Sequence, residues 1–411
     1  MFQTYLRFCH QIYRQWNVKH EDQRDDHSRD SSHQPQHLRI QETRALDLPE
    51  IRSRIASSLG LKDIASCARV SQDWNNSFTP LLFNSAILSE RGRGMLERSP
   101  SMKSVERNKH LIRHLTIKGC EYPDYINYFF WGYKKLYSTS TRDRIFLSVI
   151  PNSTLITLNL SNNRIGPNEA QALLEALKTN STLNTLHLRF NKIGDIGALT
   201  LSEALKTNST LTTLDLARNS IGPNGAQVLA EALNINNTLT TLSLSSNSIG
   251  PNGAKALAEV LKTNNTLTTL HLCHNSIGPN GAQALAEALK DNTTLATLNL
   301  YYNPIRDTGA QALAEALKTN STLTTLNLAE NEIGPNGAQA LSEALKTNST
   351  LATLNLQYNP IGGNGAQALS EALKTNKTLT TLDLRASSIG DNGAQALSEA
   401  LKTNKTCSVE H

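Results

Sequence analysis

The sequence has few of the residues that mark secretion, membrane insertion or a disulfide framework. It contains five cysteines in 411 residues, an odd number without paired spacing, which favours reduced thiols in the cytosol or nucleus. A run of about 18 apolar residues, the minimum for a transmembrane helix, does not occur. The first ten residues are interrupted by Arg7 and His10 and make a poor signal-peptide core. We therefore expect a cytoplasmic or nuclear protein without a membrane span.

Charge of one sign is scarce in the longer, C-terminal part of the chain. Residues 1–150 carry 23 Lys and Arg against 16 Asp and Glu, whereas residues 151–411 carry 17 against 19, so differences of +7 and −2 give the net charge of +5. A phosphate-binding surface is strongly basic on one face, so nucleic acid is a poor candidate partner. The sequence also has no glycine-rich phosphate loop, activated nucleophile pair or paired inward carboxylates, and we predict neither catalytic residues nor a cofactor.

The chain does contain a repeat of 28 residues. The motif L-x-x-L-x-L-x-x-N-x-I-G recurs nine times, and a fixed period of about 20–50 residues indicates a stacked array of similar units. Such arrays usually serve as binding surfaces. The first leucines of the nine copies are Leu155, Leu183, Leu211, Leu239, Leu267, Leu295, Leu323, Leu351 and Leu379.

Each repeat predicts one strand followed by one helix. Leu214 and Leu216 alternate with polar residues, as in a short half-buried strand. Residues 222–225, Gly-Pro-Asn-Gly, predict a turn and a helix start with Asn224 as the N-cap. The apolar residues of the helix then fall on one face, and they are Ala226, Leu229, Ala230 and Leu233.

Over residues 155–401 this pattern resembles the leucine-rich repeat (LRR) of the ribonuclease-inhibitor type. The resemblance implies an α/β solenoid, a curved horseshoe with a concave parallel β-sheet and convex α-helices. We assign residues 151–405 to this domain and residues 406–411 to a tail. In this family the motif asparagine, for example Asn275, bonds loop backbone. The Asn-x-Ser/Thr sequons of the repeats, such as Asn180, are interpreted as helix-to-strand turns rather than glycan sites.

A second motif lies in residues 45–88, which predict a small all-α domain. Residues 48–51 (Leu-Pro-Glu-Ile), 61–64 (Leu-Lys-Asp-Ile) and 70–74 (Val-Ser-Gln-Asp-Trp) follow in the order of an F-box, which this segment resembles. It departs from the family in lacking the usual residue between Pro49 and Glu50 and in having Ser71 where cysteine is common. The resemblance implies binding to a Skp adaptor through Leu48, Pro49, Glu50, Ile51, Ile55, Leu59, Ile64, Val70 and Trp74. The alternative is a helical cap that closes the first repeat.

The remaining segments have less specific patterns. Residues 1–44 predict an amphipathic N-terminal helix followed by a disordered linker, and the helix either docks on its own domain or targets a membrane surface. Residues 89–150 predict a linker and an irregular N-terminal capping repeat, with an extra strand at 111–117 because this stretch copies the leucine spacing. Aromatic residues at 122–137 are interpreted as part of this cap, with a binding patch as the alternative.

Differences between the repeats identify a candidate binding surface. Most positions are nearly identical from repeat to repeat, and the variation concentrates where each strand ends, on the concave face and its rim. Aromatic residues and arginine are common in protein interfaces. We therefore predict partner binding by Arg189, Phe190, Arg218, His271, His274, Tyr301, Tyr302, Glu330, Gln357, Tyr358 and Arg385.

A metal site is not predicted, although His271, Cys273 and His274 lie close in the sequence. On a strand the first two share a face and His274 points away. The neighbouring repeats place Ser243 and Asn299 beside His271, so no third ligand is expected at that level.

Taken together, an F-box followed by LRRs looks like a substrate receptor of an SCF-type ubiquitin ligase. This resemblance implies a non-catalytic scaffold, a monomer within a Skp adaptor and cullin complex, with an unknown substrate protein on the concave face. One alternative is a GTPase regulator, since the repeats also resemble those of the Ran GTPase-activating protein, although the acidic tail of that family is missing. Another is an interaction protein of the NOD-like-receptor type, for which we see no nucleotide-binding segment before the array.

Overall fold

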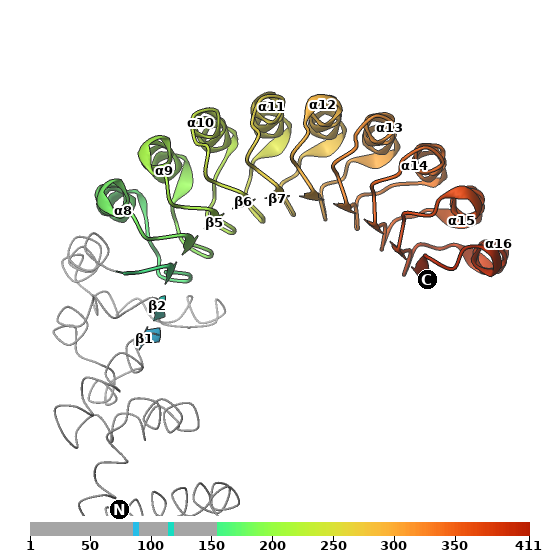
Figure 1. The fold of residues 1–411 in the computed structure, drawn as a ribbon, viewed down its shortest axis with the longest axis horizontal. Helices are drawn as coiled ribbons and strands as arrows, with labels where there is room; N and C mark the ends of the chain where they lie inside the picture. Colours follow the sequence, from blue (N-terminus) through green and yellow to red (C-terminus); the bar gives the residue numbers. More distant parts are fainter. Residues whose placement is uncertain (1–84, 90–113, 119–153) are drawn as a thin grey trace, which may run out of the picture. The chain divides into compact units, whose positions relative to one another are not determined.

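The computed structural model of the chain describes residues 85–89, 114–118 and 154–411 (Figure 1). The chain divides into two units, Met1–Phe78 and Thr79–His411, and the first lies outside the described residues. The N-terminal segment 1–44, the F-box motif residues and the aromatic residues at 122–137 are therefore not tested by the structure.

Within the described residues, twelve strands form one parallel sheet in sequence order. Each strand of the array pairs with the next at an offset of one repeat, so that Leu270 lies between Leu242 and Leu298. The strands are β1 (Ser85–Ser89), β2 (His114–Lys118), β3 (Thr157–Asn159), β4 (Thr185–His187), β5 (Thr213–Asp215), β6 (Thr241–Ser243), β7 (Thr269–His271), β8 (Thr297–Asn299), β9 (Thr325–Asn327), β10 (Thr353–Asn355), β11 (Thr381–Asp383) and β12 (Ser408–Glu410).

A helix follows each strand from β3 to β11 and returns the chain to the start of the next strand. Consecutive helices pack side by side along the array. They are α8 (Pro167–Thr179), α9 (Gly194–Thr207), α10 (Pro223–Leu233), α11 (Gly250–Leu261), α12 (Gly278–Asp291), α13 (Arg306–Leu317), α14 (Pro335–Leu345), α15 (Gly362–Thr375) and α16 (Gly390–Thr403).

The prediction of Asn224 as an N-cap is wrong. Helix α10 begins at Pro223 and is capped by Gly222, so Asn224 lies inside the first turn. Proline suits the first helical position because its missing N–H needs no partner there. The free N–H of Gly222 instead donates to Asp195 Oδ1 of the preceding repeat at 2.6 Å.

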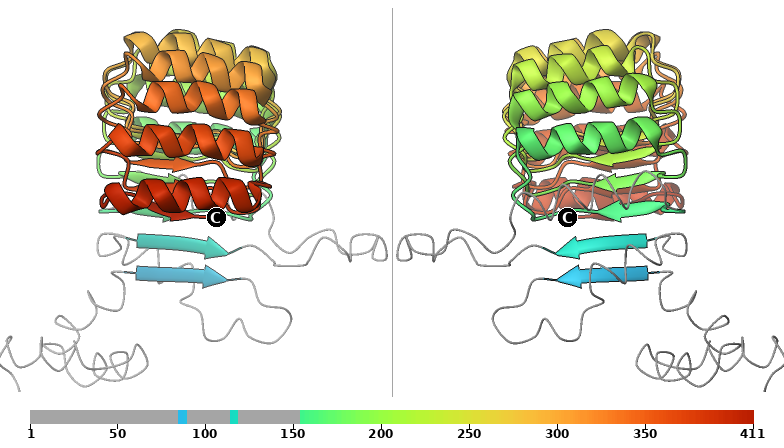
Figure 2. Two further views of the ribbon diagram at one scale, coloured as in Figure 1. Left: turned by 90° about the vertical axis from the view of Figure 1, so that its right-hand side faces the viewer. Right: turned by 90° about the vertical axis from the view of Figure 1, so that its left-hand side faces the viewer.

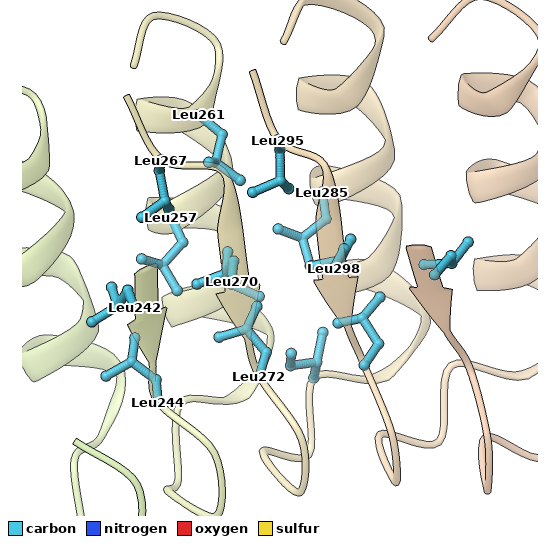
Figure 3. Close-up of a cluster of buried hydrophobic side chains, with 14 of the residues drawn as sticks. Leu242, Leu244, Leu257, Leu261, Leu267, Leu270, Leu272, Leu285, Leu295 and Leu298 are labelled. Atoms are coloured by element: carbon cyan, nitrogen blue, oxygen red, sulfur yellow. The ribbon is translucent and has the colours of Figure 1, made fainter. Parts of the chain in front are cut away.

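Leucines fill the space between the sheet and the helices as one continuous core. Leu270 lies on β7 and Leu272 directly follows this strand, and both point inward. Leu285 from α12 packs against this layer (Figure 3). All three have 0% exposed surface. Burying such a side chain stabilises the fold by about 1.5–3 kcal/mol, so each repeat depends on its neighbours for stability.

Residues 154–411 form an arc with the strands on its inner side and the helices on its outer side (Figure 1). Seen end on, the helices stack as one layer over the sheet (Figure 2). Helices are wider than strands, and this difference bends the stack. The predicted α/β solenoid is confirmed. Over the described part of the chain, no helix is both long enough and apolar enough to cross a membrane.

Both ends of the sheet extend beyond the nine repeats. The strand predicted at 111–117 is confirmed as β2, which pairs with β3. The prediction of helix up to residue 88 is wrong at its end, because β1 occupies Ser85–Ser89 and pairs with β2. The prediction of residues 406–411 as a tail is wrong, because β12 pairs with β11, and buried Cys407 takes the place of a repeat's first leucine.

Candidate protein-binding surface

The asparagine of the repeat motif holds the loop that leaves each strand. Asn303 has no exposed surface, and its Oδ1 accepts the backbone N–H groups of Asn275 and Ile277 at 3.0 and 3.1 Å. Its Nδ2 donates to the carbonyl oxygens of Leu272 and Leu300 at 2.8 and 3.1 Å. The predicted structural role of this position is therefore confirmed. Repeated along the array, these hydrogen bonds form an asparagine ladder. The ladder fixes the direction in which the residues beside it point.

A second asparagine ladder runs along the opposite edge of the sheet, where each helix returns to a strand. Asn292 Oδ1 accepts the N–H groups of Thr294 and Leu295, and its Nδ2 donates to the Leu261 carbonyl at 2.7 Å. These asparagines are the sequon residues, and their side chains are buried. Their interpretation as turn residues is confirmed, since the amide nitrogen that would carry a glycan is already bonded within the fold.

In each repeat, one residue in the loop that leaves the strand has a left-handed backbone conformation. These residues are here called the exit row. The exit residue precedes the ladder asparagine, and its N–H donates to the next repeat, as Tyr302 does to the Ala329 carbonyl at 2.9 Å. Left-handed backbone favours glycine and asparagine, and it is unusual for bulky residues. The exit row consists of Asn162, Phe190, Arg218, Ser246, His274, Tyr302, Glu330, Tyr358 and Ala386, with φ between 52° and 61°.

Four predicted residues meet in an aromatic cluster just after β7, β8 and β9. The His274 ring stacks on Tyr302 with centroids 4.3 Å apart and meets Tyr301 edge-on at 4.9 Å. The Tyr301 hydroxyl donates to Glu330 Oε1 at 2.7 Å. This hydrogen bond and burial raise the pKa of Tyr301 to about 12. The phenol is the donor of this hydrogen bond and holds the Glu330 carboxylate in place.

A second group of predicted residues contains two arginines and lies just after β4 and β5. The guanidinium of Arg189 lies 5.0 Å from the centroid of the Phe190 ring, and that of Arg218 lies 4.5 Å from it. Both distances are within the range of cation–π attraction. Phe190 remains 41% exposed, so this cluster presents an apolar ring between two positive charges.

Between the two clusters, polar side chains cross the concave face at the last residue of each strand. His187, Asp215, Ser243 and His271 are paired in register from β4 to β7. Burial raises the pKa of Asp215, but His187, the Ala217 amide and the Ser243 hydroxyl outweigh it and hold that pKa below its usual value. Nδ1 of His187 lies 3.9 Å from Asp215 Oδ2, an ion-pair contact rather than a short hydrogen bond. Burial lowers the pKa of His271, against the attraction of Asp215.

The expectation that Ser243 and Asn299 flank His271 is confirmed by the strand register. Cys273 is half-buried, and burial raises its pKa. Across the described ranges, no three His, Cys, Asp or Glu side chains lie close enough to hold a metal ion.

The last predicted residues lie near the C-terminal end of the array. Arg385 pairs with Asp383 at 2.6 Å and with Glu410 at 3.2 Å. Gln357 is half-buried, and Tyr358 is 55% exposed. The structure thus brings seven of the eleven predicted residues together in two clusters. His271, Gln357 and Tyr358 lie outside both clusters, and Arg385 is paired with its own neighbours.

The LRR domain family of NLRC3 matches residues 141–408. The chain belongs to this family. No curated protein matches the chain. Among solved structures, leiomodin-1 actin-binding site 2 is 23% identical with a TM-score of 0.31, and the match covers 45% of this chain and 91% of that one. The tropomodulin C-terminal domain of Caenorhabditis elegans is 17% identical with a TM-score of 0.32, covering 38% and 93%. Neither likeness bears on function.

The LRR domain also exposes apolar residues that the sequence analysis did not single out. Ile196 and Leu199 on α9 are 68% and 48% exposed, and Ile235 after α10 is 58% exposed. Their signal in the sequence is a departure from the repeat. Most other copies have asparagine or threonine in place of Ile196, glutamine or lysine in place of Leu199, and threonine in place of Ile235. Ile196 and Ile235 lie at opposite ends of neighbouring helices, so they do not form one continuous patch.

Proposed function

We propose that this chain is a non-catalytic scaffold that holds a partner protein on the concave face and exit row of its LRR domain. The observation that carries this proposal is the kind of residue found in the exit row. Phe190, Tyr302 and Tyr358 occupy left-handed positions at which asparagine or glycine would be less strained. Keeping exposed aromatic rings there costs stability, and strained positions of this kind cluster at binding sites.

More specifically, we propose that this scaffold is a substrate receptor in an SCF-type ubiquitin ligase. It is supported by the F-box resemblance of residues 45–88, and these motif residues lie outside the described part of the chain. In this role the N-terminal segment binds a Skp adaptor joined to a cullin, and the LRR domain holds the substrate protein. Ubiquitin transfer is then a reaction of a partner, promoted by proximity. The odd number of cysteines without paired spacing in the sequence supports a cytoplasmic or nuclear location.

The adaptor interaction is the step that tests this role. We expect the full chain to bind purified Skp adaptor at micromolar concentration, and Ile51→Ala with Ile64→Ala to abolish binding. Each buried isoleucine contributes about 1.5–3 kcal/mol to an interface. Isothermal titration calorimetry measures the affinity, and circular dichroism checks that the helical content of the LRR domain is unchanged. The Tyr302→Ala, Tyr358→Ala variant is the matched control and should bind the adaptor normally. Lack of adaptor binding by the wild-type chain would refute the ligase role.

A second candidate is an interaction protein of the NOD-like-receptor type. The match of residues 141–408 to the LRR domain of NLRC3 favours it. In both roles the exit row binds a partner protein. The two roles differ in the other proteins that the chain binds. Affinity purification of the full chain from its native cells, scored for Skp adaptor and cullin, distinguishes them. Recovery of both supports the ligase role, and their absence beside a partner that depends on the exit row supports the second candidate.

A further inference from the structure

Most carboxylates on the LRR domain are already neutralised by the fold. On the helices a glutamate pairs with the lysine three residues later, as Glu315 does with Lys318. On the loops Glu332 pairs with Arg306 at 3.0 Å. Glu330 is one of several carboxylates that make no ion pair with any residue that the structure describes, and it is the one of them that lies in the exit row. Its Oε1 accepts a hydrogen bond from the Tyr301 hydroxyl, and Glu330 is only half-buried. One negative charge is therefore fixed in position without a cation.

Two exposed tyrosines lie on either side of this carboxylate in the exit row. Tyr302 precedes Glu330 by one repeat and Tyr358 follows it by one repeat. Backbone hydrogen bonds link these repeats, from Tyr302 N–H to the Ala329 carbonyl and from Glu330 N–H to the Gln357 carbonyl, both 2.9 Å. Neighbouring strands are about 4.8 Å apart, so the two tyrosine backbones are separated by about 10 Å. His274 stacks on one face of Tyr302 from the preceding repeat and leaves the other face of that ring uncovered by His274.

We propose that Tyr302, Glu330 and Tyr358 form a binding site for an arginine side chain of the partner protein. This inference rests on the proposed function and specifies the chemistry of the partner. A guanidinium is planar, stacks on aromatic faces and donates hydrogen bonds in a fork that fits a carboxylate. A plane that stacks between two rings needs about 3.5–4 Å on each side, which the tyrosine side chains can provide across this spacing. A lysine ammonium is a compact, strongly hydrated charge that cannot stack in this way.

Charge along the exit row limits where such an arginine binds. Arg189 and Arg218 lie over the Phe190 ring just after β4 and β5 and make no ion pair within the described part of the chain. They repel a basic segment from that end of the array. A basic stretch of the partner is therefore held over β8 to β10, next to Glu330, and the partner has a defined orientation on the concave rim.

The experiment measures binding of three fluorescent peptides to the full chain by anisotropy at low salt. Each peptide has the same glycine and serine background with three arginines, three lysines or three citrullines, where citrulline keeps the planar shape and lacks the charge. We expect the arginine peptide to bind at least threefold more tightly than the lysine peptide and the citrulline peptide not to bind measurably. Glu330→Gln should weaken arginine-peptide binding at least tenfold. Glu332→Gln, which removes an equal charge two residues further along the chain, should change it less than twofold.

The inference is overturned if the arginine peptide does not bind, or if arginine and lysine peptides bind equally and both glutamine variants weaken them alike. The second pattern would mean attraction by net charge only. Failure here is distinct from failure of the proposed function. A partner protein that is still lost on Tyr302→Ala with Tyr358→Ala, while Glu330→Gln has no effect on it or on the peptide, would refute the arginine site and leave the scaffold role in place.

Discussion

At the scale of single residues, asparagine has two structural positions in the repeat, with Ser387 in place of the motif asparagine in the last copy, and the sequence distinguished them only in part. The role of the motif asparagine, such as Asn303, follows from the family pattern. The second ladder did not, because a sequon such as that of Asn292 reads the same whether its amide is exposed or bonded to backbone. Only the packing of one repeat on the next buries that amide and supplies its partners.

The buried ladder leads to a prediction for Asn303→Ala. This change removes the acceptor of two backbone N–H groups and the donor to two carbonyls. A buried polar group left without a partner costs about 1–3 kcal/mol. We expect the free energy of unfolding to fall by at least about 3 kcal/mol, measured by urea denaturation with circular dichroism. Asn280→Ala is the control, since Asn280 is exposed on α12, and should change stability by less than about 0.5 kcal/mol. Equal losses would show that the ladder is not needed.

Residue chemistry at the binding surface was partly predictable. The variable positions were found because the rest of each repeat is nearly constant. The hydrogen bond from Tyr301 to Glu330, the stacking of His274 on Tyr302 and the neutralisation of Arg385 were not found. These contacts join residues about one repeat apart or depend on rotamers, and a pattern of spacings contains neither the direction of a side chain nor the charge beside it.

At the scale of elements, the strands and helices of the nine repeats follow from leucine periodicity, whereas the strands at the ends do not. β1 has the sequence Ser-Ala-Ile-Leu-Ser without the repeat motif, and β12 has Ser-Val-Glu after a cysteine in place of leucine. Both form because an adjacent strand offers unpaired backbone groups. The preference of asparagine for the N-cap position also misplaced the start of α10. A proline and a neighbouring aspartate decide where this helix begins.

Alanine in place of either of two glycines of α12 should have the opposite effect on stability from the one it has in an isolated helix. A methyl group at Gly281 would lie 2.4 Å from Ile277 Cγ2 and 3.1 Å from Ala254 Cβ. In an exposed helix, alanine in place of glycine stabilises by about 1 kcal/mol. Here overpacking against α11 should instead destabilise the protein by about 1–3 kcal/mol. Gly278 has a φ of +65° with open space around it, so Gly278→Ala should cost only about 1–2 kcal/mol of backbone strain.

Thermal and urea unfolding of Gly281→Ala and Gly278→Ala measure these effects. The account requires that Gly281→Ala be destabilising. A stabilised Gly281→Ala variant would show that the helices can separate without loss, and that close helix packing does not set the spacing of the array.

At the scale of the whole molecule, the fold was predictable and the partner was not. A 28-residue period allows a single architecture, because strand leucines and helix leucines have no burial except against neighbouring repeats. The array is nearly neutral in total, yet within the described residues Arg189 and Arg218 follow β4 and β5 without an ion pair, and Glu330 follows β9 without one. That separation of charge depends on which ion pairs form on the helices and loops, and composition averages it away.

The central claim is that the exit row, rather than the helical face, binds the partner. The most direct test is quantitative affinity purification of the full chain from its native cells in three forms: wild type, Tyr302→Asn with Tyr358→Asn, and Lys318→Ala with Lys346→Ala. Asparagine is favoured in left-handed backbone, so the first variant should unfold at a temperature no lower than the wild type. It should nevertheless lose at least tenfold of the bound partner, about 1.4 kcal/mol. The lysine variant, altered in exposed ion pairs of the convex helices, should retain its partner. Equal loss from both variants, or cross-links that place the partner on the helices, would contradict the account.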